Sequence, residues 1–132
     1  MEYEETENNK LEEYVTKVMI EMGVPAHLKG YRYLRASIIM AEEDMEVVGS
    51  VTKLLYPEIA KKYKTTEQKV ERAIRNAIEV SWMRGNVRIF EELFGYSVQT
   101  GNSRPTNSEY IAQIADKISL DLRNEGREAD NI

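Results

Sequence analysis

The sequence has 132 residues, no cysteine and a net charge of −5. This length predicts one domain with a core of its own. The lack of cysteine excludes disulfides and thiolate metal sites, and it fits a reducing compartment. No apolar run approaches the roughly 20 residues of a membrane span, so we expect a cytoplasmic protein that inserts into no membrane.

The charge is unevenly distributed along the chain. Between Lys53 and Arg88 there are nine Lys or Arg but only four Asp or Glu, whereas the remainder is strongly acidic. A protein that binds phosphates needs a locally basic surface rather than a basic total. The segment around residues 53–88 is therefore the candidate for contact with nucleic acid.

The N-terminal segment combines a polar tail with an amphipathic helix. Residues 1–10 are acidic without apolar periodicity, which predicts a disordered tail or linker remnant. Apolar residues then follow at helical spacing until Gly23, which is expected to end the helix. These residues are Leu11, Val15, Val18 and Met22.

A second helix is predicted from Tyr31 to about Glu46. Its inward residues are expected to be Leu34, Ile38, Ala41 and Met45. Arg32 and Arg35 could contact a DNA backbone or lie in solvent. His27, the only histidine, lacks the partners that a metal or catalytic site needs, so we expect local hydrogen bonding or exposure.

A third helical segment begins at Gly49-Ser50 and runs toward Pro57. Its predicted apolar face is Val51, Leu54 and Leu55. Because Pro57 suits the first turn of a new helix, this segment is either one bent element or two short helices.

Residues 56–82 have the pattern of a helix-turn-helix. A short helix with Ala60 facing inward precedes a tight turn, and Thr65 is predicted to cap the next helix with Gln68 completing a capping box. Lys64 occupies the turn position where glycine is common. Either its backbone is left-handed, at about 1 kcal/mol, or the turn is slightly longer.

The helix after this turn has two distinct faces. Its apolar stripe comprises Val70, Ile74, Ala77, Ile78, Ser81 and Trp82. Its opposite face carries Gln68, Arg72, Arg75, Asn76 and Glu79, with Lys69 and Glu71 at the margins. A helix of this kind enters the major groove with its N-terminal half against the base edges.

The remaining sequence predicts two further helices. Gly85 is expected to end the recognition helix, and a short helix with Ile89 and Phe94 closes at Gly95. After a loop from Val98 to Pro105, Thr106 and Glu109 offer a capping box for a last amphipathic helix. The predicted fold is all-α, with about six helices around a helix-turn-helix in residues 11–124 and a frayed tail in residues 125–132.

No enzymatic site is predicted. Nucleophilic, metal or phosphoryl chemistry needs a nucleophile beside a base, a ligand cluster or a glycine-rich loop. The sequence offers a single histidine, no cysteine and no such loop. We therefore expect neither catalysis nor a metal or other cofactor.

Binding to double-stranded DNA is the interpretation that the pattern favours. Arg72 and Arg75 can each meet guanine with a bidentate fork, and Glu71 can accept from a cytosine amino group. The full set of candidate base contacts is Gln68, Glu71, Arg72, Arg75 and Asn76. The candidate phosphate contacts are Lys61, Lys62, Lys64, Thr65, Thr66 and Lys69. The alternative is a helical protein-interaction module that does not contact DNA.

Several segments resemble a known family. VPAHLKGYRYLR, SVTKLLYPEIAKKY, KVERAIRNAIEVSWMRGN and LFGY…PTNSEYIAQIADK are similar to the C-terminal effector domain of the sporulation regulator A family, response-regulator transcription factors of Bacillus and Clostridium relatives. The resemblance covers roughly Val15 to Leu122. The family's reading motif V-E-R-A-I-R falls on Val70 to Arg75, and Asn76 stands where a relative has histidine, so recognition of one base can differ.

The resemblance implies further properties. The family binds boxes of the TGNCGAA type as a dimer when a receiver domain is phosphorylated, and it activates promoters through RNA polymerase sigma subunits. The candidate contacts with polymerase or with a second copy are Arg84, Ile89, Phe94, Ala115 and Asp116.

Overall fold

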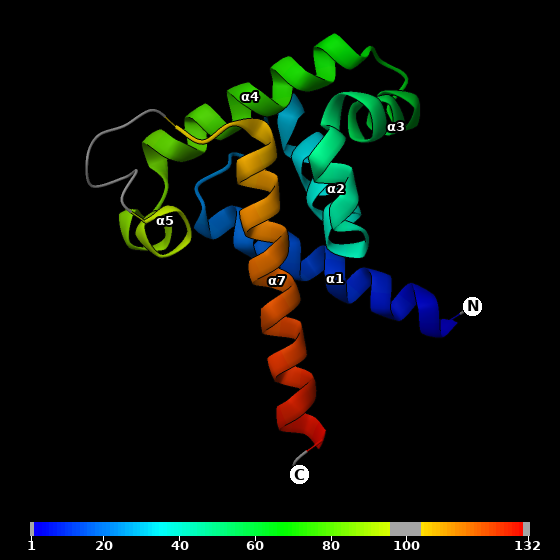
Figure 1. The fold of residues 1–132 in the computed structure, drawn as a ribbon, viewed down its shortest axis with the longest axis vertical. Coiled ribbons are helices and arrows are strands. Elements are labelled where there is room, and N and C mark those ends of the chain that lie inside the picture. The colour runs from blue at the N-terminus through cyan, green and yellow to red at the C-terminus, as the bar shows by residue number, and fades with distance from the viewer. Residues whose placement is uncertain (1, 96–103, 131–132) are drawn as a thin grey trace.

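A computed structural model describes residues 2–95 and 104–130 and shows an all-α protein (Figure 1). Within these residues there are six α-helices and no strand, which confirms the predicted fold class. The α-helices are α1 (Glu2–Glu21), α2 (Lys29–Glu43), α3 (Tyr56–Lys62), α4 (Glu67–Arg84), α5 (Val87–Phe94) and α7 (Asn107–Asp130). Two shorter turns, η1 (Met45–Ser50) and η2 (Val51–Leu55), connect α2 to α3.

Both terminal helices are longer than the sequence pattern suggests. We expected residues 1–10 to be disordered and residues 125–132 to fray, whereas α1 begins at Glu2 and α7 continues to Asp130. Glutamate and alanine are good helix formers, and acidic residues in a first turn interact favourably with the helix dipole. Once packing of the inner turns has nucleated a helix, each added residue extends it at little cost. The loop expected at Val98–Pro105 lies mostly outside the described residues.

The core forms where α2 packs against α1, α4 and α7. In Figure 1, α4 lies across one end of the molecule, and α7 runs from beside α4 to the opposite end. The predicted stripes supply the core. Its fully buried members include Val15, Met22, Leu34, Ile38, Ile74, Ile111 and Ile114. Met45 was also predicted to face inward, but it is exposed, because α2 ends at Glu43 and the extended backbone of Asp44 breaks the helical register.

The segment before α3 is one bent element rather than two separate helices. The 3-10 turn η1 is followed by the π-helical turn η2, which passes directly into α3 at Tyr56. Of its predicted apolar face, Leu55 is buried and Leu54 is exposed. Neighbouring residues of a helix point in different directions, so only one of this adjacent pair, Leu55, faces the core.

A glycine sets the distance between α2 and α4. A Cβ on Gly30 would collide with the Ala73 carbonyl oxygen and would lie 2.7 Å from the Ala73 carbonyl carbon. The absence of a side chain lets the first turn of α2 contact the backbone of α4 directly. The middle of α4 is thereby fixed against the start of α2.

Candidate nucleic-acid interface

The helix-turn-helix is formed by α3, a short turn and α4. Pro57 lies in the first turn of α3, and Ala60 faces the core. Lys64 has φ +54°, so the turn uses a left-handed residue without glycine. Of the two predicted alternatives, a left-handed backbone at Lys64 is therefore correct, and a longer turn is not needed. The turn closes through the Thr65 amide, which donates to the Ala60 carbonyl at 2.9 Å.

The cap of α4 is one residue later than predicted. Thr66, not Thr65, has its hydroxyl oxygen 3.2 Å from the Lys69 amide, from which it accepts a hydrogen bond. The predicted capping box of Thr65 with Gln68 is wrong, because Thr65 completes the turn around Lys64. The helix then begins at Glu67, which adds an acidic residue near the positive end of the helix dipole.

The two faces of α4 are separated as predicted. Val70, Ile74, Ala77, Ile78 and Ser81 are buried. The exposed side chains of the opposite face are Gln68, Lys69, Arg72, Arg75, Asn76 and Glu79. Four of the five candidate base contacts therefore share one accessible surface.

Glu71, the fifth candidate, is half-buried at the margin of that surface. Its carboxylate accepts a hydrogen bond from Arg75 at 3.1 Å, an i,i+4 ion pair in which the Arg75 side chain is 51% exposed. A pair this exposed stabilises a helix by about 0.3–0.5 kcal/mol. It orients the guanidinium of Arg75, yet a stronger partner can displace it at low cost.

The candidate phosphate contacts surround the start of α4. Lys61 and Lys62 lie in the last turn of α3, Lys64 in the connecting turn and Lys69 in the first turn of α4, and all four are exposed. Thr66 is exposed at the cap. Thr65 is half-buried, and its amide is already used in the turn, so it is the least accessible of the set.

The C-terminal end of α4 is held by a buried hydroxyl pair. The Ser81 hydroxyl donates to the Met22 carbonyl at 2.6 Å and accepts from the Tyr110 hydroxyl at 2.6 Å. Burial raises the pKa of Tyr110 well above its usual value, so the phenol stays protonated. One contact thus joins the ends of α1 and α4 to α7. The sequence places Ser81 in the apolar stripe but does not identify Tyr110 as its partner. The one available signal is that a serine interrupts an otherwise apolar stripe.

Aromatic packing reinforces this end of α4. The half-buried Trp82 ring meets the Phe90 ring edge-on, with centroids 5.0 Å apart, and the Phe94 ring at 6.2 Å. Gly85 ends α4 as predicted, although with φ −71° it is not left-handed. A Cβ there would collide with the Phe90 ring and lie 2.6 Å from the Met22 carbonyl oxygen, so close packing requires the glycine.

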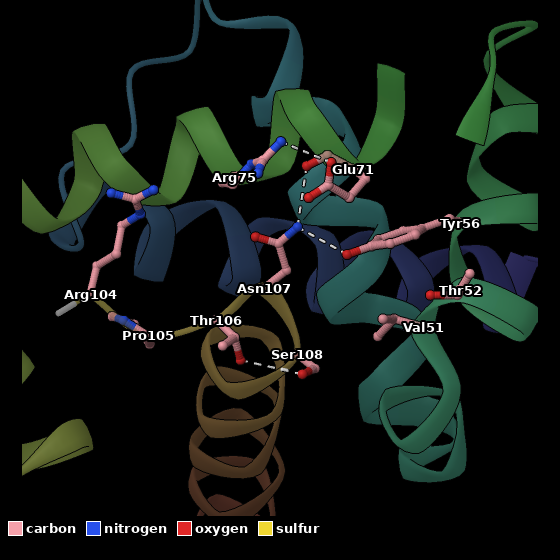
Figure 2. A pocket seen from close by; sticks show the side chains of 10 residues that line it. All are labelled: Val51, Thr52, Tyr56, Glu71, Arg75, Arg104, Pro105, Thr106, Asn107 and Ser108. Atoms are coloured by element: carbon pink, nitrogen blue, oxygen red, sulfur yellow. Dashed lines mark hydrogen bonds and ion pairs between the residues drawn. The ribbon is translucent and has the colours of Figure 1, made fainter. Parts of the chain in front are cut away.

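An open cleft of about 580 Å³ flanks the middle of α4 (Figure 2). Among the residues that line it, Asn107 donates its side-chain amide to the Tyr56 hydroxyl at 2.9 Å and to the Glu71 carbonyl at 3.2 Å. Burial raises the pKa of Tyr56, which keeps this hydroxyl protonated. Asn107 therefore joins α3, α4 and α7. In the sequence, Asn107 is distinguished only by its place between Thr106 and Glu109 of the predicted capping box.

The capping box at the start of α7 is confirmed. The Glu109 amide donates to the Thr106 hydroxyl oxygen at 3.2 Å, and the Thr106 amide donates to the Glu109 carboxylate at 3.4 Å. Beside this cap, Arg104 forms an ion pair with Glu79 of α4 at 3.4 Å. The segment that leads into α7 is therefore connected to α4 through the Arg104–Glu79 ion pair as well as through Asn107.

The candidate partner contacts differ in accessibility. Arg84 and Asp116 are exposed, and Ile89 and Phe94 are half-buried. Ala115 is fully buried in the core, so its side chain is not available to a partner, contrary to the prediction. Ala115 and Asp116 are adjacent in sequence, and adjacent residues of a helix point to different faces. Ala115 therefore faces the core, whereas Asp116 faces solvent.

His27, the only histidine, is the remaining residue that the sequence singles out. His27 is exposed in the connection between α1 and α2. Among residues 2–95 and 104–130, no three His, Cys, Asp or Glu side chains gather as metal ligands do. Likewise, no helix in the described part of the chain combines the length and apolarity that crossing a bilayer requires.

The chain matches a known protein family. Residues 15–118 match the family model described as "Sporulation initiation factor Spo0A C terminal". The match begins inside α1, includes the whole helix-turn-helix and ends inside α7. It covers most of the chain and the same segments that suggested the resemblance.

Proposed function

We propose that this chain, which belongs to the family of sporulation initiation factor Spo0A C-terminal domains, binds double-stranded DNA sequence-specifically through α4. The family is one of transcription-factor effector domains rather than enzymes. The effector domain of this chain corresponds to residues 11–124 and functions in the cytoplasm.

The two-faced α4 is the observation that carries the proposal. One face is locked into the core, whereas Arg72, Arg75, Gln68 and Asn76 project from the other. Arginine forks match guanine O6 and N7, and side-chain amides match adenine N6 and N7. A rigid helix with these groups along one exposed face is suited to the major groove, which is about 12 Å wide.

The lysines around the turn supply the sequence-independent part of binding. Lys61, Lys62, Lys64 and Lys69 surround the end of α3 and the start of α4. With the first amides of α4, they would hold backbone phosphates and fix the register of the helix in the groove. Glu71 would accept a hydrogen bond from a cytosine amino group. The ion pair between Glu71 and Arg75 already places these two side chains next to each other.

Family membership supports the finer partner proposals. We expect the domain to bind TGNCGAA-type boxes as a dimer and to contact an RNA polymerase sigma subunit. Arg84, Asp116, Ile89 and Phe94 remain the surface candidates for these protein contacts, since each is at least partly accessible. Substitution of Arg84 or Asp116 should reduce promoter activation without reducing DNA affinity.

Alanine substitution of the base-reading arginines tests the proposal. Arg72→Ala and Arg75→Ala should each lose about 1–3 kcal/mol of binding to a cognate box, because a bidentate base contact is removed. Fluorescence anisotropy with cognate and random duplexes measures this loss, and circular dichroism checks that helix content is unchanged. Arg123→Ala, a change on the exposed C-terminal part of α7, is the matched control.

Two outcomes would contradict the proposal. Parent-like cognate binding by both arginine variants would show that α4 does not contact bases. A folded parent domain that binds neither duplex at low salt would favour the protein-interaction module instead.

A further inference from the structure

Two cations from different helices converge on one aromatic ring beside the helix-turn-helix. The Arg32 guanidinium carbon of α2 lies 5.7 Å from the centre of the Tyr63 ring, and the Lys62 ammonium nitrogen of α3 lies 5.4 Å from it. Both distances are within the range of a cation–π interaction. Arg32 and Lys62 are both exposed, so their charged groups remain accessible.

The Tyr63 ring is well placed to order these side chains. Tyr63 is the C-cap residue of α3, and its backbone amide donates to the Ile59 carbonyl at 3.0 Å. The ring also packs on Tyr33 of α2, with centroids 5.2 Å apart. Because the backbone and one neighbour hold the ring, it gives both long cationic side chains a fixed surface and lowers the entropy that a ligand would have to remove.

Arg35, which lies on the same helix as Arg32, has a structural role. Its guanidinium donates to the Thr16 hydroxyl at 3.2 Å and pairs with Glu12 at 3.6 Å, both on α1. Among the described residues, the ion pairs involve Arg35, Arg75, Arg104 and Lys117, and none involves Arg32 or Lys62. The sequence left both α2 arginines open for DNA or solvent. In the structure, Arg35 joins α2 to α1, whereas the exposed Arg32 can contact a ligand.

The position of this pair relative to α4 indicates the ligand. The first turn of α2 contacts α4 at Ala73 through Gly30, so Arg32 lies on an element fixed beside the recognition helix. Lys64, with its left-handed backbone, directly follows Tyr63. When a helix occupies the major groove, the phosphates of the two strands line its flanks. Because the charged groups of Arg32 and Lys62 both lie within 5.7 Å of the centre of the Tyr63 ring, a phosphate at this ring would be attracted by two positive charges.

We propose that Arg32 and Lys62, ordered by Tyr63, form a clamp for a backbone phosphate of the bound duplex. The arginine fork provides paired donors for the phosphate oxygens, and the lysine adds a second charge. This clamp rests on the proposed function and extends it to a residue outside the helix-turn-helix. It strengthens binding to every sequence and does not discriminate between bases.

The salt dependence of binding tests the clamp. Arg32→Gln and Lys62→Gln should each lower the slope of log affinity against log salt by about one unit, and the double variant by about two. Cognate and random duplexes should weaken by the same factor, because the phosphate is common to both. Arg123→Gln, the same change of charge on the C-terminal part of α7, should leave the slope unchanged.

Variants of the ring separate order from charge. Tyr63→Leu should weaken both duplexes while leaving the slope unchanged, because both cations remain but lose their support. Tyr63→Phe, which keeps the ring, should bind like the parent. If Tyr63→Leu melts too early for a binding measurement, the Arg32→Gln slope still decides the clamp.

The outcomes distinguish this inference from the proposed function. An unchanged slope in Arg32→Gln, alongside a lowered slope in Lys64→Ala, would overturn the clamp and leave DNA binding by α4 intact. A loss confined to the cognate duplex would assign Arg32 to base reading and also overturn the clamp. Absence of duplex binding by the folded parent would overturn both.

Discussion

The two ends of α4 are built in opposite ways. At its C-terminal end, Ser81 joins Met22 and Tyr110 inside the core, and Trp82 packs on the aromatic rings of α5. At its N-terminal end, one side-chain cap and a left-handed lysine lead into a surface of exposed cations. One end is fixed by buried contacts with three other helices, and the other offers its polar groups to solvent.

This difference shows how a recognition helix can be both rigid and available. Buried hydrogen bonds and close aromatic contacts hold a helix in one orientation, because any displacement leaves polar groups unpaired. The same contacts at the N-terminal end would consume the side chains that a ligand needs. Gly30 and Asn107 complete the arrangement by fixing α4 at Ala73 and at Glu71.

The largest expected effect is at the anchored end. Trp82→Ala should reduce the free energy of unfolding by about 3 kcal/mol, the lower end of the range for Trp→Ala, because the ring is half-buried. Thermal or urea denaturation measures the loss, and DNA affinity should fall only as the folded population falls. An unchanged melting transition with weakened DNA binding would mean that Trp82 contacts the ligand and that this end is not anchored by the ring.

Ser81→Ala should cost about 2 kcal/mol. The substitution leaves the Met22 carbonyl and the Tyr110 hydroxyl without the partner that they share, inside the core. Ser37→Ala is the control, since that buried hydroxyl donates only to the Tyr33 carbonyl of its own helix. Urea denaturation of both variants compares them. Equal losses would show that the bridge between helices adds nothing beyond an ordinary buried serine.

At the open end, removal of the cap should have a smaller effect. Thr66→Ala should cost about 1 kcal/mol, the usual effect of losing an N-cap hydroxyl. Thr65→Ala should cost less, since the turn uses its backbone amide rather than its hydroxyl. The same denaturation experiment ranks the two variants. The reverse order would place the cap where the sequence pattern put it.

The sequence was sufficient for features that depend on local periodicity. The stripe from Val70 to Ser81, the inward Ala60 and the capping box of Thr106 all follow from spacing and residue type. The cap of α4 could not be placed, because it depends on whether Lys64 adopts a left-handed backbone, and both turn geometries were compatible with the same residues.

The features that the sequence could not supply are contacts between distant segments. Asn107 reaches Tyr56 and Glu71, and Tyr110 reaches Ser81, through the packing of α7 on α4. Ala115 was a candidate partner contact by resemblance, whereas the packing of α7 into the core buries it. Local patterns specify the helices, but the angle at which two helices meet decides which polar side chains become partners.

The smallest expected effect separates backbone strain from charge at the open end. A left-handed backbone costs an L-residue about 1–2 kcal/mol, and glycine avoids this cost but loses about 0.5–1 kcal/mol through its more flexible unfolded chain. Lys64→Gly should therefore stabilise the domain by about 0.5 kcal/mol, since Lys64 has φ +54°. Lys64→Ala should leave stability nearly unchanged, because alanine carries the same strain.

Both Lys64 variants lose one positive charge, so both should lower the salt slope of duplex binding by about one unit. Urea denaturation and salt-dependent anisotropy on the same pair of proteins give the two readings. If glycine and alanine were equally stable, the turn would not be left-handed in solution. If the slopes differed between them, the turn geometry itself would position the phosphate. The open end of α4 would then depend on its backbone as much as the anchored end depends on its side chains.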